Sequence, residues 1–468
     1  MKILYFNWVP SRALSIDGGG VSIYQKNLLS YFSTKDDTEV FYLTTSYAYD
    51  LLHKVPYIRK SKNCTIPGVH EYEIVNAPIL APSFYSFNKV NAYFQHDKTI
   101  DAINEFIQKN GKFDVIHFNN LEGISARILE LKKIHSDTKF IYSLHNYFPF
   151  CAQVNLWYRD YENCKDYKEG QKCRNCNLFP VNYSQKMFQR SDFANLNHRK
   201  VFAIAGKIFS FFHKEENSEP NPDYRYRREN YVKLINENVD LVLCVSERVR
   251  KIATIMGIKQ DKCLVHYIGT KHADYANCYP NIIQHDGNIT LGYLGYMRRD
   301  KGFYFFLDTL EKVSPQLAKH IGIKVAAPIT DNKAAQRLCR LKNKFKSVKL
   351  FNGYKPENLK DILKDVNLGV VPVLWEDNLP QVALEFTAYG IPIFTSNLGG
   401  AQELSMSNAF IFKAGDTNDF INKLQNIIMN HNSLLDFWPE RNQKHILISV
   451  KKHCEDLYKL YEKKEKYE

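Results

Sequence analysis

Acid and amide side chains gather in one stretch of the chain, residues 368–404. The apolar run Leu368–Val373 predicts a buried strand, and the polar turn Trp375–Leu379 follows it. Pro380 fits the first turn of a helix, and Gly390 suits the position just past the end of that helix. Parallel sheets bind ligands at such turns, and a helix N-terminus offers free N–H groups to an anion. This stretch therefore predicts a site for an anionic ligand.

Two carboxylates in this stretch are spaced for one extended ligand. Asp377 and Glu385 lie eight positions apart, so one sits at the mouth of the helix and the other well inside it. Carboxylates placed in this way can hold the two ends of a ligand through its hydroxyl groups. The alternative is an ordinary strand–helix unit with a capping Asp and a solvated Glu, and the residues alone fit both readings.

Two further turns have the composition of anion sites. Asp17-Gly18-Gly19-Gly20 stands between the predicted strand Lys2–Trp8 and a helix, so its backbone N–H groups can approach an anion or a sugar. The turn Tyr296–Gly302 carries Arg298, Arg299 and Lys301 and can neutralise a diphosphate. By themselves, a glycine triplet is more often a plain turn and a basic turn more often a solvated loop.

A histidine follows another predicted strand, Lys139–Leu144. His145 lies at the C-terminal end of this strand, where ligands collect in parallel sheets. A lone histidine in such a place is more often structural than catalytic.

Together these motifs resemble the donor-binding signature of retaining glycosyltransferases with the GT-B fold, family four (the group 1 type). The signature pairs two acids eight positions apart and ends in a Gly-Gly-x-x-Glu motif. This chain departs from it at three positions: Asp377 stands for Glu, Pro380 for Gly and Phe386 for Ala. Glu376, beside Asp377, could take the role of the first acid. The matching residues are Val382, Glu385, Ala388, Gly390, Pro392, Gly399, Gly400 and Glu403.

The resemblance implies roles for the residues of the second half. Glu385 would hold the ribose of a nucleotide sugar, and Asp377 with the backbone of Asn378 and Leu379 would meet the donor sugar. The loop Gly353–Pro356 would clasp the base.

The same resemblance assigns residues to the donor diphosphate and a sugar contact in the first half of the chain. Lys301 would meet the donor phosphates, together with Arg298 or Arg299 in place of the family arginine, whose position Tyr296 takes. The glycine loop, with Gly19 and Gly20, would face the donor phosphates across a cleft, and His145 would contact the transferred sugar.

A cysteine-rich insert separates the two halves of the first domain. Its spacing is C-x12-C-x8-C-x2-C, and four thiolates with one close pair can form a tetrahedral structural zinc site. Such a site would pin a loop and do no chemistry; the alternative is buried free thiols or a facultative disulfide. The four residues are Cys151, Cys164, Cys173 and Cys176.

Composition limits the classes of partner. The 468 residues carry a formal net charge of +13, which suits nucleic acid, an anionic membrane surface or phosphorylated substrates. No nucleic-acid-binding motif occurs, so we expect no nucleic acid. No apolar run is long enough for a transmembrane helix, and the N-terminus is typical of a first strand. Ten cysteines in so long a chain do not resemble a secreted disulfide framework, so we expect a cytoplasmic protein.

Alternating strand and helix patterns predict an α/β fold with parallel, helix-covered sheets. The resemblance implies GT-B: two Rossmann-like domains that face each other across a cleft, with the last helix crossing back to the first domain. We expect an acceptor-side domain at 1–270, with inserts at 151–176 and 182–238 and completed by 449–468, and a donor domain at 285–448. The basic helical pattern Asn182–Lys214 fits a core or a peripheral contact with the inner membrane face.

The expected function is transfer of a sugar from a UDP- or GDP-sugar to a hydroxyl acceptor. Retention of configuration follows from the resemblance alone, and no metal cofactor is expected in the reaction, because lysine and arginine can replace a divalent ion. The acceptor is expected to be a glycan or lipid-linked glycan of a cell-surface polysaccharide. The alternatives are a nucleotide-sugar epimerase of the same fold and a non-catalytic sugar-nucleotide-binding protein.

Overall fold

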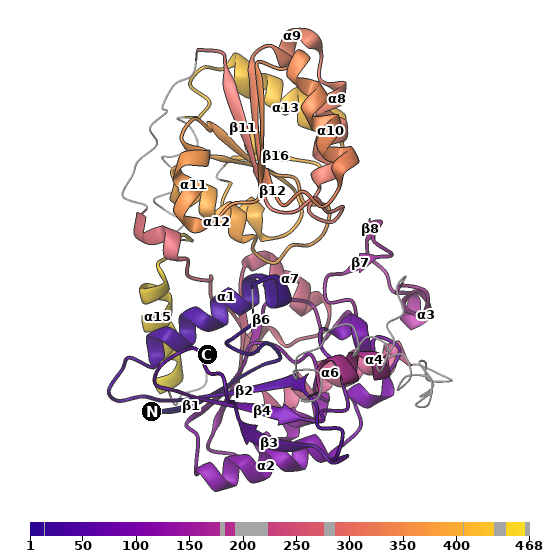
Figure 1. Cartoon of the computed structure of the whole chain (residues 1–468), viewed down its shortest axis with the longest axis vertical. Helices are drawn as coiled ribbons and strands as arrows, with labels where there is room; N and C mark the ends of the chain where they lie inside the picture. Colours follow the sequence, from indigo (N-terminus) through magenta and orange to yellow (C-terminus); the bar gives the residue numbers. More distant parts are fainter. Residues whose placement is uncertain are drawn as a thin grey trace.

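Two parallel sheets organise the molecule, one in each half (Figure 1). The computed structural model describes residues 1–13, 15–177, 183–191, 223–275, 286–405, 407–434 and 446–463. We call the part built on the larger sheet the first domain and the part built on the smaller sheet the second domain. Figure 1 shows the first domain below and the second above.

The first domain contains an eight-stranded sheet of order β10-β9-β6-β5-β1-β2-β4-β3. Its strands pair in parallel, except that β3 runs antiparallel to β4 at the edge. The inner strands are buried on both faces, as expected for a sheet covered by helices. The strands are β1 (Lys2–Asn7), β2 (Glu39–Ala48), β3 (Tyr57–Lys60), β4 (Val69–Val75), β5 (Val115–Phe118), β6 (Lys139–Leu144), β9 (Leu241–Cys244) and β10 (Cys263–Val265).

Two helices of the first domain differ from the sequence prediction. The glycine triplet is not the end of a loop: α1 already begins at Ser15 (Ser15–Phe32), and Gly19 interrupts it with a φ of 56°. The segment Gly123–His135, whose amphipathic pattern predicts an α-helix, contains instead a 3-10 helix, η3 (Ala126–Lys133), capped by Ser125. The other main helices are α2 (Lys98–Asn110), α6 (Tyr224–Asn238) and α7 (Glu247–Ile255).

The insert after β6 forms small elements. These are the hairpin β7–β8 (Trp157–Tyr158 and Glu162–Asn163), the 3-10 helix η4 (Lys168–Gly170) and the helices α3 (Gln171–Arg174) and α4 (Tyr183–Gln189). Of these, η4 and α3 contact α6. Most of the predicted helical segment Asn182–Lys214 lies outside the described residues.

The second domain contains a six-stranded, all-parallel sheet of order β13-β12-β11-β14-β15-β16. Its central strands are fully buried. The strands are β11 (Ile289–Leu294), β12 (Ile321–Ala327), β13 (Ser347–Asn352), β14 (Leu368–Val371), β15 (Ile393–Ser396) and β16 (Ile411–Phe412). The helices are α8 (Phe303–Lys312), α9 (Pro315–Ala318), α10 (Asn332–Arg340), α11 (Pro356–Leu363), α12 (Gln381–Ala388) and α13 (Thr417–Met429).

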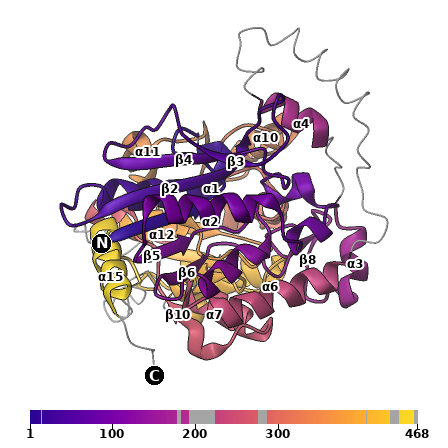
Figure 2. The same cartoon turned by 90° about the horizontal axis from the view of Figure 1, so that it is seen from below.

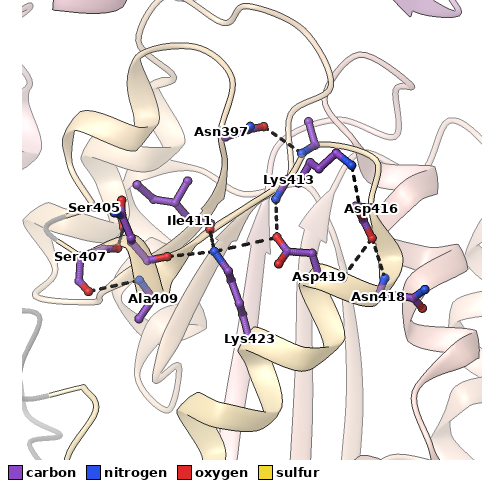
Figure 3. A network of polar contacts seen from close by, with 12 residues as sticks. Asn397, Ser405, Ser407, Ala409, Ile411, Lys413, Asp416, Asn418, Asp419 and Lys423 are labelled. Atoms are coloured by element: carbon purple, nitrogen blue, oxygen red, sulfur yellow. Dashed lines mark hydrogen bonds and ion pairs between the residues drawn. The ribbon is translucent and has the colours of Figure 1, made fainter.

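Polar contacts close the β16 edge of this sheet (Figure 3). Asp416 caps α13 by accepting hydrogen bonds from the backbone of Asn418 and Asp419. Asn397 accepts from the backbone of Ala414 at 3.0 Å, and Lys423 reaches the carbonyl of Ile411. These bonds satisfy backbone groups that the short last strand leaves unpaired.

The chain crosses between the domains twice, at neighbouring points. Thr270, leaving the first domain, forms a bridge with Ser449, where the chain returns. The last helix, α15 (Val450–Glu462), then packs on the first domain beside α1, and Figure 2 shows it next to the N-terminus. Tyr461 of α15 places its hydroxyl 2.6 Å from His117 Nδ1 in the core of the first domain. None of the helices in the described ranges is long and apolar enough to span a bilayer.

Candidate active site

An ion pair marks the C-terminal end of β14. Lys301 Nζ lies 2.6 Å from Asp377 Oδ2, and the ammonium group also lies 5.0 Å from the centre of the Trp375 ring. Asp377 belongs to the turn after β14, and Lys301 to the turn after β11. Neighbouring parallel strands therefore deliver both groups to one edge of the sheet, where ligands bind in this kind of fold.

Two glycines permit this close assembly. Gly302 has a φ of 72°, and a β-carbon there would lie 1.7 Å from the carbonyl oxygen of Pro372. Gly399 has a φ of 70°, and its β-carbon would lie 2.2 Å from the carbonyl oxygen of Asp377. A larger residue at either position would push apart the turns that carry Lys301 and Asp377.

The two arginines of the basic turn have different surroundings. Arg298 binds the buried carboxylate of Asp300 through two hydrogen bonds, of 3.0 and 2.7 Å. Arg299 is exposed, lies 5.7 Å from the centre of the Tyr304 ring and has no ion pair with any described residue. Arg299 is thus the guanidinium of this turn that can bind an anion without losing an existing partner.

The side chain of Glu385, on α12, is largely buried. Tyr354 donates a hydrogen bond of 2.6 Å to its carboxylate, and His272 Nε2 lies 3.7 Å from the other oxygen. Burial raises the pKa of Glu385 to about 7, although the hydrogen bond from Tyr354 acts in the opposite direction. Tyr354 lies in the loop that the sequence analysis assigns to the base, while His272, in the crossing between the domains, gave no signal in the sequence.

The glycine turn of the first domain faces α12 of the second. A β-carbon at Gly20 would lie 3.5 Å from Gln381 Cγ, at the first residue of α12. Pro380, at the N-cap, makes no side-chain capping bond, so the first N–H groups of α12 have no side-chain cap. Gly20 therefore lies across from the N-terminus of α12, and N–H groups at such a terminus can bind an anion. The phosphate contact of Gly19 and Gly20 stays a prediction.

His145 lies at the end of β6 in the first domain. Its ring packs on that of Tyr24 of α1, with 4.3 Å between the ring centres. Burial lowers the pKa of His145 to about 3, so the ring is neutral at physiological pH. Its Nε2 atom is buried without a hydrogen-bond partner among the described residues.

Further polar atoms near the ion pair are buried and unpaired. Both side-chain amide atoms of Asn378, the indole nitrogen of Trp375 and the hydroxyl of Tyr147 have no partner within the described part of the chain. The pKa of Tyr147 is raised by burial and by the charges of Glu376 and Asp377, which brings Tyr147 of the first domain into this neighbourhood. Buried polar groups normally have hydrogen-bond partners, so a cluster of unpaired ones indicates a ligand site.

The four cysteines of the insert line one small cavity, together with Tyr167 and Arg228. Burial raises the pKa of Cys173 to about 12 and that of Cys176 to about 11. Across the described ranges, no three His, Cys, Asp or Glu side chains are arranged as ligands of one metal ion. Zinc binding by Cys151, Cys164, Cys173 and Cys176 therefore stays a prediction.

One protein-family model matches the second domain. Residues 288–430 match the model of the family Glycosyl transferases group 1. A curated relative is an uncharacterized 42.6 kDa protein in the cps region of Klebsiella pneumoniae, 22% identical over 311 residues, or 66% of this chain. The match spans 64% of that relative's own length.

Solved structures match almost the whole chain. HepE of Anabaena in complex with UDP superposes with a TM-score of 0.57 at 13% identity, covering 98% of this chain and 99% of that one. Sucrose-phosphate synthase from Thermosynechococcus elongatus gives a TM-score of 0.56 at 15% identity and covers 98% of both chains. The chain has the GT-B fold. With the matched domain, this fold supports a glycosyltransferase of the group 1 type.

Within this GT-B architecture, the predicted residues fall into two groups on the second domain. Lys301 and Asp377 are paired at the end of β14, whereas Glu385 lies on α12 with Tyr354. Gly20 of the first domain approaches the start of α12, and Arg298 is bound by Asp300. Tyr147 and His272 were not predicted, because their positions in the chain carry no motif.

Proposed function

We propose that this chain transfers a sugar from a nucleotide-sugar donor to a hydroxyl acceptor, with retention of configuration. The observation that carries the proposal is the Lys301–Asp377 pair, ringed by the unpaired polar atoms of Asn378, Trp375 and Tyr147. A sugar offers several hydroxyl groups that both donate and accept, so it can satisfy such a mixed set of partners.

The positive groups fit the charge that develops on the leaving diphosphate. Lys301, Arg299 and the N-terminus of α12 surround one edge of the second sheet, where their field would stabilise the departing phosphate. Asp377 would then accept a hydrogen bond from a hydroxyl group of the sugar, while Lys301 moves towards the phosphate. With no side-chain nucleophile identified, the donor phosphate itself would take the proton of the acceptor hydroxyl.

Glu385 is proposed to hold the ribose and Tyr354 to lie beside the base. The donor class is proposed to be a UDP-sugar, because HepE was solved with UDP and with UDP-glucose. The acceptor is proposed to be a glycan or lipid-linked glycan of a cell-surface polysaccharide, which agrees with the cps-region relative.

A nucleotide panel tests the donor site. We expect one nucleoside diphosphate to raise the melting temperature of the wild type. The same nucleotide should leave the melting temperature of Glu385→Ala unchanged. Slow release of nucleotide from the matching nucleotide sugar, without acceptor, would separate an enzyme from a binding protein. Conversion of the donor without nucleotide release would identify an epimerase, and no thermal shift with any nucleotide would refute the proposal.

A further inference from the structure

Two carboxylates of the second domain bind one helix of the first. Glu403, in the 3-10 helix η9 (Gly400–Glu403), accepts hydrogen bonds from the backbone N–H groups of Glu247 at 3.0 Å and Arg248 at 2.7 Å. These are the first residues of α7, so the carboxylate lies at the positive end of that helix. Tyr267 of the first domain donates a further bond of 2.9 Å to Glu403.

The second carboxylate is that of Glu376, in the turn after β14. Arg248 donates to it from one edge of its guanidinium: Nε lies 2.8 Å from one oxygen, and Nη2 donates to the other. The same carboxylate accepts a bond of 3.0 Å from the backbone N–H of Gly399. The Glu376 side chain is buried and that of Arg248 is partly buried, and a bidentate arginine–carboxylate bond is strong and specific.

These contacts adjoin the donor-site turn itself. Glu376 precedes Asp377 in the chain, and the carbonyl of Asn378 accepts a bond of 2.8 Å from Ser246, the N-cap residue of α7. The position of the turn that carries Asp377 and Asn378 is therefore set partly by the first domain. If the domains moved apart, these interdomain bonds would all break together.

We propose that Glu376 and Glu403 are positioning residues that close the cleft on α7 and thereby place Asp377 and Asn378 for sugar transfer. This inference rests on the proposed function for its catalytic part. It assigns Glu376 to domain closure and not to the donor, because its two carboxylate oxygens are already used by Arg248 and Gly399. The two side-by-side crossings at Thr270 and Ser449 then act as the hinge.

Opening of the cleft can be measured without any substrate. We expect Glu376→Gln, and more strongly the double variant with Glu403→Gln, to have a larger radius of gyration than the wild type by small-angle X-ray scattering. A matched control is Glu311→Gln, which removes a bidentate pair with Arg337 inside the second domain and should leave the radius unchanged. Circular dichroism and the melting temperature report whether each variant is folded.

The catalytic consequence is a split between turnover and binding. Once the donor is identified, Glu376→Gln should lower kcat at least about tenfold and change the nucleotide Kd less than about twofold, because closure and not binding is impaired. Arg248→Lys keeps the charge but loses the bidentate bond, so its kcat should lie between those of the wild type and Arg248→Gln. Arg248→Gln should lower kcat as much as Glu376→Gln does.

Two results would overturn the inference. An unchanged radius of gyration in the folded double variant would show that these carboxylates do not hold the cleft closed. A nucleotide Kd raised as strongly as kcat is lowered would place Glu376 at the donor and not at the closure. The scattering result stands whether or not the chain transfers sugar, so it separates failure of this inference from failure of the proposed function.

Discussion

Lys301 and Asp377 neutralise each other's charge in the structure. Their charged atoms are 2.6 Å apart in a partly buried site, where such a bond is stronger than in water. On the proposed function, the donor exchanges this one bond for two: diphosphate to Lys301 and sugar hydroxyl to Asp377. The pair thus keeps an otherwise costly buried charge neutral between turnovers.

The two arginines of the basic turn should respond differently to the same substitution. We expect Arg299→Gln to raise the Kd for the nucleoside diphosphate about tenfold, the loss of one charge-assisted bond. Arg298→Gln should change that Kd little but lower the melting temperature, because the buried Asp300 loses its partner. Titration calorimetry and differential scanning calorimetry of the two variants check this, and equal Kd values for both variants would contradict it.

The buried carboxyl of Glu385 should lower the free energy of unfolding as the pH rises from 4.5 to about 7. Its pKa is raised to about 7 in the folded protein from 4.5 in the unfolded chain, so the folded state holds an extra proton between these values. The free energy of unfolding should therefore fall by about 1.4 kcal/mol per pH unit across that window.

Glu385→Gln removes this dependence. We expect the variant to match the wild type in stability near pH 4.5 and to exceed it at pH 8, in urea titrations at both values. At the same time the variant should lose nucleotide binding. A stability difference between variant and wild type that does not change with pH would mean that the carboxyl is solvated.

At the scale of elements, apolar runs and helical periodicity predict most of the parallel strands, and they predict helices at Thr417–Met429 and Val450–Glu462, which are α13 and α15. Strands β3, β4 and β16 were not predicted. The stretch from β14 to β15 was predicted as strand, helix and strand because its buried runs are bounded by Pro380, Gly390 and two polar turns. The break of α1 at Gly19 agrees with the turn that the glycine triplet indicates, but the helical turn that begins at Ser15, before the glycines, was not predicted. The site contacts of Tyr147 and His272 could not be predicted, because they depend on how the two domains face each other.

The cysteine insert provides a prediction at this scale. If the four thiols bind zinc, protein purified without chelator should contain about one zinc per chain, and Cys173→Ser should lose it. Metal analysis by mass spectrometry, with Cys339→Ser on the exposed side of the second domain as a control, checks this. Absence of zinc together with a full count of free thiols would favour the alternative of buried cysteines.

At the scale of the whole molecule, a cluster of buried histidines lies where α15 packs on the first domain. His453 of α15 lies 3.0 Å from the Tyr24 hydroxyl, and its ring centre is 4.4 Å from that of His266. Burial lowers the pKa of His266 to about 4 and those of His453 and His117 well below the usual 6.5. These rings are neutral in the folded protein, as His145 is.

Acid should therefore destabilise the fold through this cluster. Below pH 6.5 the unfolded chain binds protons that the buried rings cannot, so stability is lost as pH falls from 6.5 towards 4. The loss is at most about 1.4 kcal/mol per pH unit for each histidine. We expect the urea midpoint of unfolding to be lower at pH 5.5 than at pH 7.5. The measurement uses the Glu385→Gln variant, so that this carboxyl does not contribute. An unchanged midpoint would contradict the burial of the cluster.

The return of the chain at Ser449 has a consequence for biosynthesis. Residues of α15 fill the core of the first domain next to Tyr5 and His117, yet they are translated after the entire second domain. As the chain leaves the ribosome, the second domain can fold while the first still lacks a helix. The first domain must therefore wait, with an apolar face uncovered, until α15 has been translated, and this interval is when a chaperone would be most useful.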